Sequence, residues 1–453
     1  MLKQKETIVA LATPPGIGSI GVIRLSGINA YEIGCKLTQT HLKTRHAHYL
    51  KFYDNDNQVI DQGIAIFFKA PHSFTGEDIV ELQGHGGPVV MNLLIKAALN
   101  YGALLAKPGE FTERAFLNDK LDLAQAEAIA DLIAASSENA AKSALRSLEG
   151  VFSQQINKLV DQLIYLRSYV ESAIDFPDEE IDFLSDGKIE SQLSVLKNQV
   201  NHILDISRQG AILNEGMTVV IAGKPNAGKS SLLNALSGKD SAIVTDIAGT
   251  TRDVLKEYIH VNGLPLHIID TAGIRDSYDL IEQEGIKRAL TAIEEADCIL
   301  LVSDINEIAD PSSKPQAITN LSKLTTLPTN IPTINVYNKV DLLKQPPTDS
   351  NNSIHISAKT GHGIEQLKNK LLEIIGFKST NESLFTARER HINALESAKD
   401  HLNTGFEQLT IYHSGELLAE ELKLAQNQLS SITGAYTADD LLGEIFSSFC
   451  IGK

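Results

Sequence analysis

The sequence predicts a multidomain fold that combines α/β regions with an all-α region. An apolar, β-branched run at 217–222 leads into a glycine-rich loop and then into a helix-forming run, which is the order strand, loop, helix. Leucine and isoleucine recur at helical spacing over long stretches before and after this region. Short apolar runs separated by Pro, Gly and Asn turns fill the first part of the chain, as in a mixed α/β domain.

Length and composition predict a soluble globular protein. At 453 residues the chain is long enough for about three domains. Hydrophobic residues make up 43% and charged residues 21%, which is typical of soluble domains. There is neither an apolar signal segment after Met1 nor an apolar run long enough to span a membrane, so we expect a cytoplasmic protein. Cys35, Cys298 and Cys450 are too few and too scattered for a disulfide framework or a zinc site.

The net charge of −17 limits the ways in which the protein could bind nucleic acid. Broad, non-specific binding needs a cationic surface, so the overall charge argues against it. A local contact with RNA stays open, and so does a basic partner that holds the RNA.

Residues 1–118 predict an α+β N-terminal domain. Residues 79–82 read as a strand with one carboxylate, which leads through Gly84–Gly87 into an apolar helix from Pro88. We interpret the glycine segment as a strand-to-helix turn, and a weak phosphate or oxyanion loop is the alternative. The other expected strands are 7–10, 20–25 and the two arms of a hairpin, 48–53 and 63–68.

Two helical segments flank residues 216–377. In the first, 119–215, an apolar stripe from Leu145 to Val170 predicts one long helix, and a second stripe runs from Ile189 to Leu204. The segment 378–453 carries two more stripes, at 395–409 and 418–429. The stripe from Leu145 to Val170 predicts a core, with a coiled-coil-like partner contact as the alternative. Because neither segment has a complete core alone, we expect one discontinuous helical domain.

The inserted region begins with a phosphate-binding pattern. Gly223–Ser230 reads G-x-x-x-x-G-K-S between a strand and a helix. The glycines let backbone N–H groups face phosphates, and the helix N-terminus adds a favourable dipole. Lys229 would reach the β- and γ-phosphates, and the Ser230 hydroxyl would bind Mg²⁺. A chance glycine-rich turn is the alternative.

Three further strand ends follow in the order expected of a GTPase. Residues 267–273 end in Asp-x-x-Gly, so Asp270 would bind Mg²⁺ through water and the Gly273 N–H would sense the γ-phosphate. Asn338–Asp341 reads N-K-x-D, whose carboxylate would accept hydrogen bonds from the guanine N1–H and 2-amino group. Adenine offers neither donor, so the sequence predicts GTP rather than ATP. Ser357–Lys359 resembles the loop that backs the guanine ring.

A polar loop at 245–253 is expected to be the switch region. A threonine hydroxyl there can complete the Mg²⁺ shell when the γ-phosphate is present. Thr251 is our choice for this ligand, and Thr250 is the alternative.

The residue after Asp-Thr-Ala-Gly is Ile274, where the Ras pattern has glutamine. A branched apolar side chain cannot orient a water molecule, so hydrolysis needs another polar group. The candidates just downstream are Arg275, Glu282 and Glu284. Each of them, taken alone, could equally be a solvated charge on the following helix.

Several segments together resemble one family. They are 13–16 (Thr-Pro-Pro-Gly), 118–127 (Asn-Asp-Lys-Leu-Asp-Leu-Ala-Gln-Ala-Glu), the phosphate loop with Asn226, 249–253 (Gly-Thr-Thr-Arg-Asp) and 450–453 (Cys-Ile-Gly-Lys). On these residues the whole chain resembles the MnmE (TrmE) family of bacterial tRNA-modification GTPases. The resemblance implies a folate-binding and dimerisation domain at 1–118, a helical domain in two parts (119–215 and 378–453), and an inserted P-loop Ras-like GTPase domain at 216–377.

The resemblance also implies ligands that the spacing of residues does not reveal. The family binds a tetrahydrofolate derivative as one-carbon donor, in the 5,10-methylene or 5-formyl form. The folate contacts carried over are Arg24, Glu81, Lys120 and Lys453. A carboxylate suits the amino-pyrimidinone edge of a pterin, and cations suit its carbonyls and glutamate tail.

For hydrolysis, the resemblance implies a K⁺ ion and a water-orienting Glu282. The K⁺ contacts carried over are Asn226, Thr245, Ile247 and Thr250. The ion takes the place of an arginine finger, an element worth about 10³–10⁵ in rate.

Members of the family form homodimers and act as a heterotetramer with the flavoprotein MnmG. Together they add an aminomethyl or carboxymethylaminomethyl group at carbon 5 of the tRNA wobble uridine. The residues expected to contact GTP lie in the phosphate loop, the switch region and the three strand ends: Asn226, Ala227, Gly228, Lys229, Ser230, Ser231, Thr245, Asp246, Ile247, Ala248, Gly249, Thr250, Thr251, Asp270, Thr271, Ala272, Gly273, Asn338, Lys339, Asp341, Ser357, Ala358 and Lys359.

Two classes of function agree with the GTPase motifs alone. One is an enzyme subunit in folate-dependent tRNA modification, and the other is a switch in ribosome assembly or signalling that modifies nothing. The sequence has no evident basic RNA-binding module, and the terminal motif with Lys453 has no place in a switch. Both observations favour the enzyme.

Overall fold

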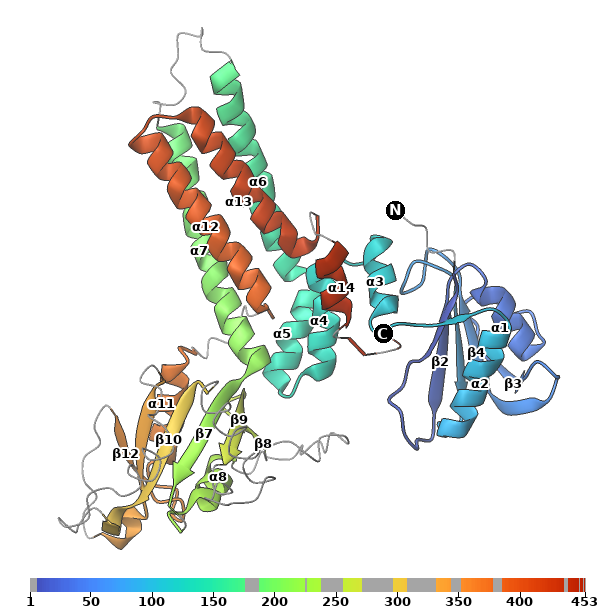
Figure 1. Cartoon of the computed structure of the whole chain (residues 1–453), viewed down its shortest axis with the longest axis horizontal. Helices are drawn as coiled ribbons and strands as arrows, with labels where there is room; N and C mark the ends of the chain where they lie inside the picture. Colours follow the sequence, from blue (N-terminus) through green and yellow to red (C-terminus); the bar gives the residue numbers. More distant parts are fainter. Residues whose placement is uncertain are drawn as a thin grey trace, which may run out of the picture. The chain divides into compact units, whose positions relative to one another are not determined.

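The protein has a multidomain α/β plus all-α fold, as predicted (Figure 1). The computed structural model describes residues 6–175, 187–224, 226–237, 256–270, 296–307, 331–343, 352–377, 385–435, 439–447, 449–450 and 452. The chain divides into two compact units, one with residues 1–130, 147–196 and 397–453 and the other with 131–146 and 197–396. These limits cut through helices, so the domain limits at 118, 215 and 377 stay predictions.

A six-stranded sheet forms the first part of the first unit. Its order is β3-β4-β5-β2-β1-β6, and all neighbours are antiparallel except β1 and β6. Helices α1 (Ala30–Thr38) and α2 (Pro88–Asn100) pack on one face, where Leu37 and Leu94 meet Leu82 in a buried core. The strands are β1 (Ile8–Leu11), β2 (Gly21–Ser26), β3 (His48–Tyr53), β4 (Val59–Phe68), β5 (Ile79–Gly84) and β6 (Leu104–Leu105).

The hairpin prediction is confirmed, because β3 and β4 pair in antiparallel register. The second arm begins at Val59 rather than at Gly63. The interpretation of Gly84–Gly87 as a strand-to-helix turn is also confirmed, since Gly84 ends β5 and α2 begins at Pro88.

The structure contradicts the prediction of one long helix from Leu145 to Val170. This stretch forms two helices, α5 (Glu138–Leu148) and α6 (Val151–Asp175). Gly150 lies between them with φ of +87°, a left-handed conformation that ends a helix. The side-chain amide of Gln125 caps the Leu148 carbonyl at 2.9 Å. Leu145 is 45% exposed, so it does not belong to the buried stripe.

The remaining apolar stripes are confirmed as buried faces. Helix α6 packs along α13 (Gly415–Thr433), and Leu163 and Leu422 on these helices are fully buried. The other two stripes lie on α7 (Lys188–Glu215) and α12 (Glu389–Thr410), and both are buried except for Phe406, which is half-buried. The part of the first stripe that lies on α6 therefore belongs to the chain's own core rather than to a partner contact.

The C-terminal residues return to the first unit's N-terminal part. The shorter helices there are α3 (Glu110–Leu117), α4 (Leu123–Ala134) and α14 (Asp439–Ser447). The ring of Phe446 lies 6.3 Å from that of Phe116, and Phe449 is buried beside it. The Gly109 N–H donates to the Cys450 carbonyl at 3.4 Å, which holds the tail next to α3.

A second six-stranded sheet, in the order β12-β11-β10-β7-β9-β8, forms the core of the second unit. All neighbours are parallel except β8 and β9, so the carboxyl ends of β7, β9, β10 and β11 meet at one edge. The elements are β7 (Met217–Gly223), α8 (Lys229–Ser237), β8 (Lys256–Val261), β9 (Leu264–Asp270), β10 (Cys298–Asp304), η3 (Ile305–Glu307), β11 (Thr333–Asn338), η4 (Val340–Leu342), β12 (Ser353–His355) and α11 (Ile364–Ile374).

The predicted strands before the four GTPase motifs are confirmed at 217–223, 264–270, 333–338 and 353–355. Buried side chains of α8 and α11, among them Leu232 and Leu367, pack with the sheet in one core. Among the helices that the structure describes, none has the length and the apolar character needed to cross a membrane.

Candidate functional site

The glycine-rich loop follows β7, in the interior of the second sheet. The neighbours of β7 are β9 and β10, and the chain visits β9 first and β10 afterwards on the other side. Ligands of parallel α/β sheets bind outside the carboxyl ends of the strands at such a switch point. Helix α8 begins at Lys229 directly after the loop, so its unpaired N-terminal N–H groups face the same place.

Lys229 is buried inside the loop. Its Nζ donates to the carbonyl oxygens of Gly223 at 2.8 Å and Lys224 at 3.1 Å. Asn226 and Gly228 have φ of +68° and +90°. Two left-handed residues in one short loop turn successive N–H groups toward a common point, which suits an anion.

The close approach of Asn338 also requires a glycine at position 228. A Cβ on Gly228 would lie 2.3 Å from Nδ2 of Asn338, the last residue of β11. Asn338 is 2% exposed, so it has no room to move away. The phosphate loop and the end of β11 therefore approach more closely than any side chain at this position allows.

The amide of Asn338 joins three segments of the chain. Its Nδ2 donates to the Ala227 carbonyl at 3.0 Å. Its Oδ1 accepts from the backbone N–H of Lys339 at 2.8 Å and of Ala358 at 3.1 Å. One buried side chain thus holds the phosphate loop, the N-K-x-D segment and the 357–359 segment in a single arrangement.

Lys339 adds a second link between these segments. Its Nζ donates to the Asn226 carbonyl and to Oδ2 of Asp304, both at 2.8 Å. Burial alone would raise the pKa of Asp304, but hydrogen bonds from Lys339 and Asn306 outweigh it and lower that pKa. Asp304 therefore stays charged and fixes the Lys339 ammonium.

Sequence reasoning missed Asp304. The signal was present, because Asp304 ends the apolar run at 298–304. In the sheet it lies beside Asn338 on the neighbouring parallel strand. A carboxylate at the end of a buried parallel strand is placed at the ligand edge of the sheet.

The carboxylate of Asp341 is held on one side only. The buried Ser357 hydroxyl donates to its Oδ1 at 2.6 Å, and Ser357 Oγ in turn accepts from the Thr360 N–H at 3.2 Å. Oδ2 makes no hydrogen bond with the described residues. The carboxylate is thus oriented and keeps an accepting oxygen at the surface.

Several predicted residues lie outside the described part of the chain. They belong to the switch region, the segment after β9 and the C-terminus: Thr245, Asp246, Ile247, Ala248, Gly249, Thr250, Thr251, Thr271, Ala272, Gly273, Arg275, Glu282, Glu284 and Lys453. Of Asp270 only the backbone is described, and it pairs with Ile221 on β7. Ser230 and Ser231 lie exposed in the first turn of α8.

A second candidate site lies on the N-terminal sheet, on the face opposite α1 and α2. Arg24 on β2 is the register partner of Glu81 on β5. Its Nε and Nη2 both lie 2.9 Å from Oε1 of Glu81. The rings of Phe74 and Phe111 lie 5.9 and 5.8 Å from the guanidinium carbon. Oε2 of Glu81 makes no hydrogen bond with the residues described, so it can accept from a ligand.

The C-terminal tail and Lys120 reach the same site from two sides. Nη1 of Arg24 donates to the Gly452 carbonyl at 3.5 Å. A Cβ on Gly452 would lie 2.2 Å from the Leu11 carbonyl oxygen, so only glycine permits this approach. Nζ of Lys120 donates to the Pro71 carbonyl at 3.1 Å, on the β4–β5 connection that also carries Phe74. The structure thus brings Arg24 and Glu81 together directly and places Lys120 on an adjoining connection.

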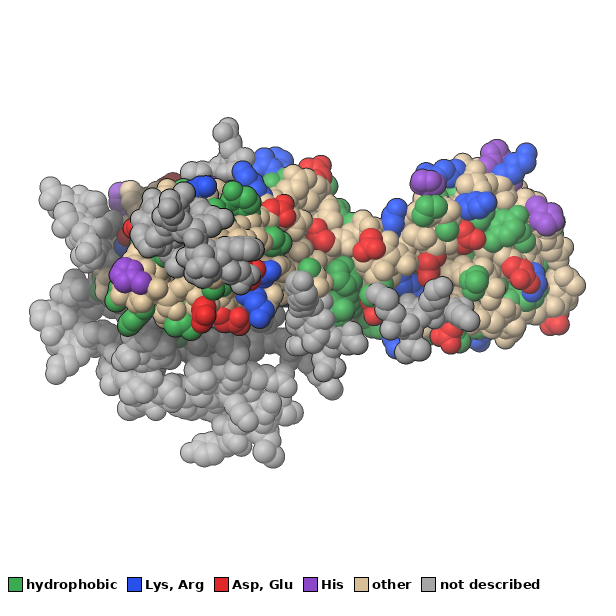
Figure 2. Space-filling model, turned by 90° about the horizontal axis from the view of Figure 1, so that it is seen from above, with side chains coloured by type: hydrophobic (Ala, Val, Ile, Leu, Met, Phe, Trp, Pro, Cys, Tyr) green, Lys and Arg blue, Asp and Glu red, His purple; other side chains and the backbone are tan. Residues whose placement is uncertain are grey.

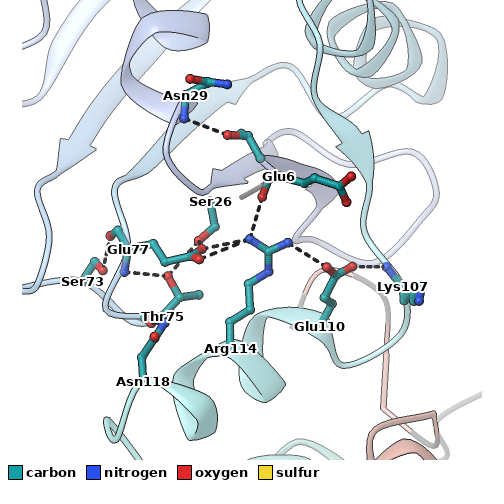
Figure 3. A network of polar contacts seen from close by, with 11 residues as sticks. Glu6, Ser26, Asn29, Ser73, Thr75, Glu77, Lys107, Glu110, Arg114 and Asn118 are labelled. Carbon is teal, nitrogen blue, oxygen red and sulfur yellow. Dashed lines mark hydrogen bonds and ion pairs between the residues drawn. The ribbon is translucent and has the colours of Figure 1, made fainter. Parts of the chain in front are cut away.

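A buried charged network fixes that connection (Figure 3). Arg114 on α3 is 2% exposed, and its guanidinium lies between the carboxylates of Glu77, at 3.1 Å, and Glu110, at 2.8 Å. Ser26 on β2 also donates to Glu77, at 2.7 Å. Helix α3, strand β2 and the β4–β5 connection are therefore held as one piece, which sets the position of Phe74.

The chain is similar to known proteins over almost its whole length. Two family models match the chain: GTP-binding protein TrmE N-terminus over residues 7–120, and MnmE helical domain over residues 123–450. A Francisella tularensis subsp. holarctica (strain FTNF002-00 / FTA) protein named tRNA modification GTPase MnmE is 57% identical over 99% of each chain. Proteins of the same name from Haemophilus influenzae (strain PittEE) and Pasteurella multocida (strain Pm70) are 57% and 59% identical, over 99% of this chain and 100% of theirs.

The contact between Gly228 and Asn338 leads to a testable prediction. We expect Gly228→Ala to lower the affinity for guanine nucleotide by about tenfold or more, which corresponds to about 1.4 kcal/mol. The reason is that a methyl group at 2.3 Å from Asn338 Nδ2 must displace the loop or the amide. Titration with a fluorescent GDP analogue measures the effect.

Gly376→Ala is the matched control. Gly376 has φ of +70° and nothing within 4 Å of its missing Cβ, so the variant carries the strain of a left-handed alanine without the clash. We expect its affinity to stay within about twofold of the wild type, since only backbone strain is added. Equal affinities for the two variants would show that the close approach to Asn338 does not matter.

Proposed function

Because the chain belongs to the MnmE (TrmE) family of tRNA modification GTPases, we propose that it hydrolyses GTP and uses hydrolysis in tRNA modification. The observation that carries the proposal is the buried Asn338 amide, which joins the phosphate loop to the two segments that would read guanine. A ligand with phosphates at one end and a base at the other would contact all three segments.

Guanine selectivity is assigned to Asp341. The Ser357 hydroxyl orients its carboxylate, and Oδ2 remains as an acceptor for the N1–H and 2-amino donors of guanine. Lys229 and the first turn of α8 would bind the β- and γ-phosphates, because that is where N–H groups and the ammonium converge. The other proposed GTP contacts are the residues of the phosphate loop, the switch region and the three strand ends that the sequence motifs predict.

Hydrolysis is assigned to Glu282, which would orient the attacking water in place of the glutamine that Ile274 replaces. Ser230 and Thr251 would hold Mg²⁺, and Asn226, Thr245, Ile247 and Thr250 would hold K⁺. Of these, the exposed Ser230 hydroxyl beside Lys229 is an oxygen ligand of the kind Mg²⁺ prefers, and the exposed Asn226 stands at the rim of the loop. Bound cations there would neutralise charge that develops on the phosphates during transfer.

The Arg24–Glu81 site is proposed to bind a tetrahydrofolate derivative, with Lys120 and Lys453 as further contacts. Three features support the proposal: an accepting oxygen on Glu81, a guanidinium fixed by Glu81, and aromatic rings from Phe74 and Phe111 within 6 Å of it. A pterin presents donors that match the carboxylate and a flat ring that suits the aromatic walls. The bound cofactor would supply the one-carbon unit.

The product we propose is a wobble uridine that carries an aminomethyl or carboxymethylaminomethyl group at carbon 5. The partners would be a second copy of the chain, the flavoprotein MnmG in a heterotetramer, and the tRNA substrate in the cytoplasm. The chain aligns with the named MnmE relatives over almost their whole length, which supports the transfer of these assignments as a proposal.

The decisive test is an analysis of tRNA nucleosides by mass spectrometry. Deleting the gene should remove the carbon-5 modification of the wobble uridine, and the wild-type gene should restore it. We expect Glu81→Gln to fail in this complementation because the neutral amide presents a donor and loses the charge that pairs Arg24. Glu138→Gln, at a carboxylate whose side chain is 80% exposed, is the matched control and should restore the modification. An unchanged nucleoside profile after deletion would refute the function.

A second test addresses the chemistry of GTP hydrolysis. Replacing Na⁺ by K⁺ at equal ionic strength should raise the rate of phosphate release. Glu282→Ala should lower turnover by at least about 10²-fold, the range for loss of a water-activating group, while nucleotide still binds. Glu284→Ala is the control and should keep turnover. Normal hydrolysis by Glu282→Ala would refute its role, and equal rates in the two salts would refute the K⁺ site.

A further inference from the structure

One corner of the N-terminal sheet is basic although the chain as a whole is acidic. We call residues 36–53 and 62–76 the basic corner. These two segments contain no Asp or Glu, in a chain whose net charge is −17. Their cationic and imidazole residues are Lys36, Lys43, Arg45, Lys51, Lys69, His41, His46, His48 and His72.

The two segments lie side by side in the fold. Strands β3 and β4 pair within them, with His48 opposite Ala65. The residues before β3 continue along β4, since Thr44 bridges to Phe67 and the Arg45 N–H donates to the Phe67 carbonyl at 2.8 Å. Figure 2 shows Lys, Arg and His side chains gathered along one rim of the lobe that contains this sheet.

Arg45 is held in a preset position. Its φ is +56°, a left-handed conformation that is unfavourable for a residue with a Cβ. The guanidinium carbon lies 5.9 Å from the centre of the Phe68 ring, and Nη2 donates to the His72 carbonyl at 2.7 Å. Among the described residues, these contacts use one of its five N–H donors, and the other four can bind an anion.

Four of the five Lys and Arg side chains of the basic corner form no ion pair with a carboxylate among the residues that the structure describes, and the fifth, Lys36, pairs with Glu32. Lys43, Arg45, Lys51 and Lys69 are exposed, and none forms an ion pair with the residues described. Lysines elsewhere do pair along their helices: the exposed Lys142 with Glu138, the exposed Lys423 with Glu420, and the half-buried Lys370 with Glu373.

Four of the carboxylates that flank the corner make contacts of their own. Glu32 pairs with Lys36, and Asp61 pairs with His85. Asp54 accepts from the N–H groups of its own turn, and Asp78 accepts from the Ala70 N–H at 2.8 Å. Lys43, Arg45, Lys51 and Lys69 therefore remain unpaired among the described residues.

His48 reports this positive field. The Lys43 N–H donates to its Nε2 at 2.9 Å, so that nitrogen carries no proton. Burial lowers the pKa of His48, and the neighbouring His46 and Lys43 charges lower it further. The ring of His46 lies 4.6 Å from that of His48. The neighbouring positive charges thus disfavour the protonated form of His48, and an anion bound beside them would stabilise that form.

We propose that the basic corner binds the sugar–phosphate backbone of the tRNA substrate. This proposal depends on the proposed function in one respect, which is that the RNA is a tRNA. Arg45 is placed to bind one phosphate in bidentate fashion, and Lys43, Lys51 and Lys69 act as point charges on its neighbours. Tyr49 on β3 is 71% exposed and offers a ring on which an unpaired base can stack.

An RNA backbone fits this surface better than an acidic protein does. Protein interfaces are depleted in lysine at their centres, whereas phosphate-binding surfaces are built from Lys and Arg. The net charge of −17 is compatible with the proposal, because the contact needs only local charge within a screening length of about 10 Å.

The test compares two triple variants of the full-length chain that lose the same number of positive charges. The first is Lys43→Gln, Arg45→Gln and Lys51→Gln, all in the basic corner. The second is Lys142→Gln, Lys370→Gln and Lys423→Gln, all on helices. Binding of unmodified tRNA is measured by fluorescence anisotropy over a series of salt concentrations, and melting temperature and GTP turnover are recorded for each protein.

We expect wild type and the helix variant to bind with equal affinity and equal salt dependence. The corner variant should bind at least about tenfold more weakly, and its slope of log K against log salt should be smaller by about one for each phosphate that the variant no longer neutralises. Imidazole resonances of His48 should show a higher pKa in the tRNA complex than in the free protein.

Three results would overturn the proposal: wild type that does not bind tRNA at low salt, a corner variant that binds like wild type, or equal losses of affinity in both variants. A corner variant that keeps tRNA but loses an acidic protein partner would assign the surface to that partner instead. Absence of GTP turnover in wild type would contradict the proposed function without touching the binding result.

Discussion

The buried amide of Asn338 is the constraint on which the nucleotide site depends. One of its two N–H donors bonds the Ala227 carbonyl, and its oxygen accepts from two backbone N–H groups, those of Lys339 and Ala358. Leaving such buried groups unpaired costs about 1–3 kcal/mol each, so the three segments are held together as a unit. The other special features follow: a glycine at 228, the left-handed Lys339 with φ of +69°, and Asp304, which fixes the Lys339 ammonium.

The site on the N-terminal sheet also depends on buried polar contacts, which here are ion pairs rather than hydrogen bonds of an amide. Burying the guanidinium of Arg114 is unfavourable unless it is paired, and Glu77 and Glu110 supply the pairs. The outcome is a rigid β4–β5 connection that carries Phe74 to within 5.9 Å of Arg24. In both sites the polar groups that define the geometry lie behind the surface at which a ligand would bind.

Sequence reasoning succeeded where the signal is local. The ends of β7, β9 and β11 could be placed because an apolar, β-branched run followed by a polar motif marks the carboxyl end of a buried strand. It failed at Gly150, because apolar residues spaced by three and four positions continue in the sequence across the break, although Leu145 before it is exposed and Phe152 after it is buried.

Interactions between residues distant in sequence left no signal in the chain. Nothing near Arg114 in the sequence reveals that it meets Glu77, 37 positions away. The net charge of −17 likewise did not reveal the basic corner, because a sum over the whole chain does not show which segments lack carboxylates. The folate, K⁺ and partner assignments come from family resemblance and stay predictions.

The central claim is that the Asn338 amide organises the guanine-nucleotide site, and calorimetric titration of GDP into Asn338→Ala tests it most directly. Asn335→Ala, on the same strand β11, is the matched control. We expect Asn338→Ala to bind at least about tenfold more weakly because three backbone groups lose their partner, and Asn335→Ala to bind like wild type. Wild-type affinity in Asn338→Ala would contradict the claim.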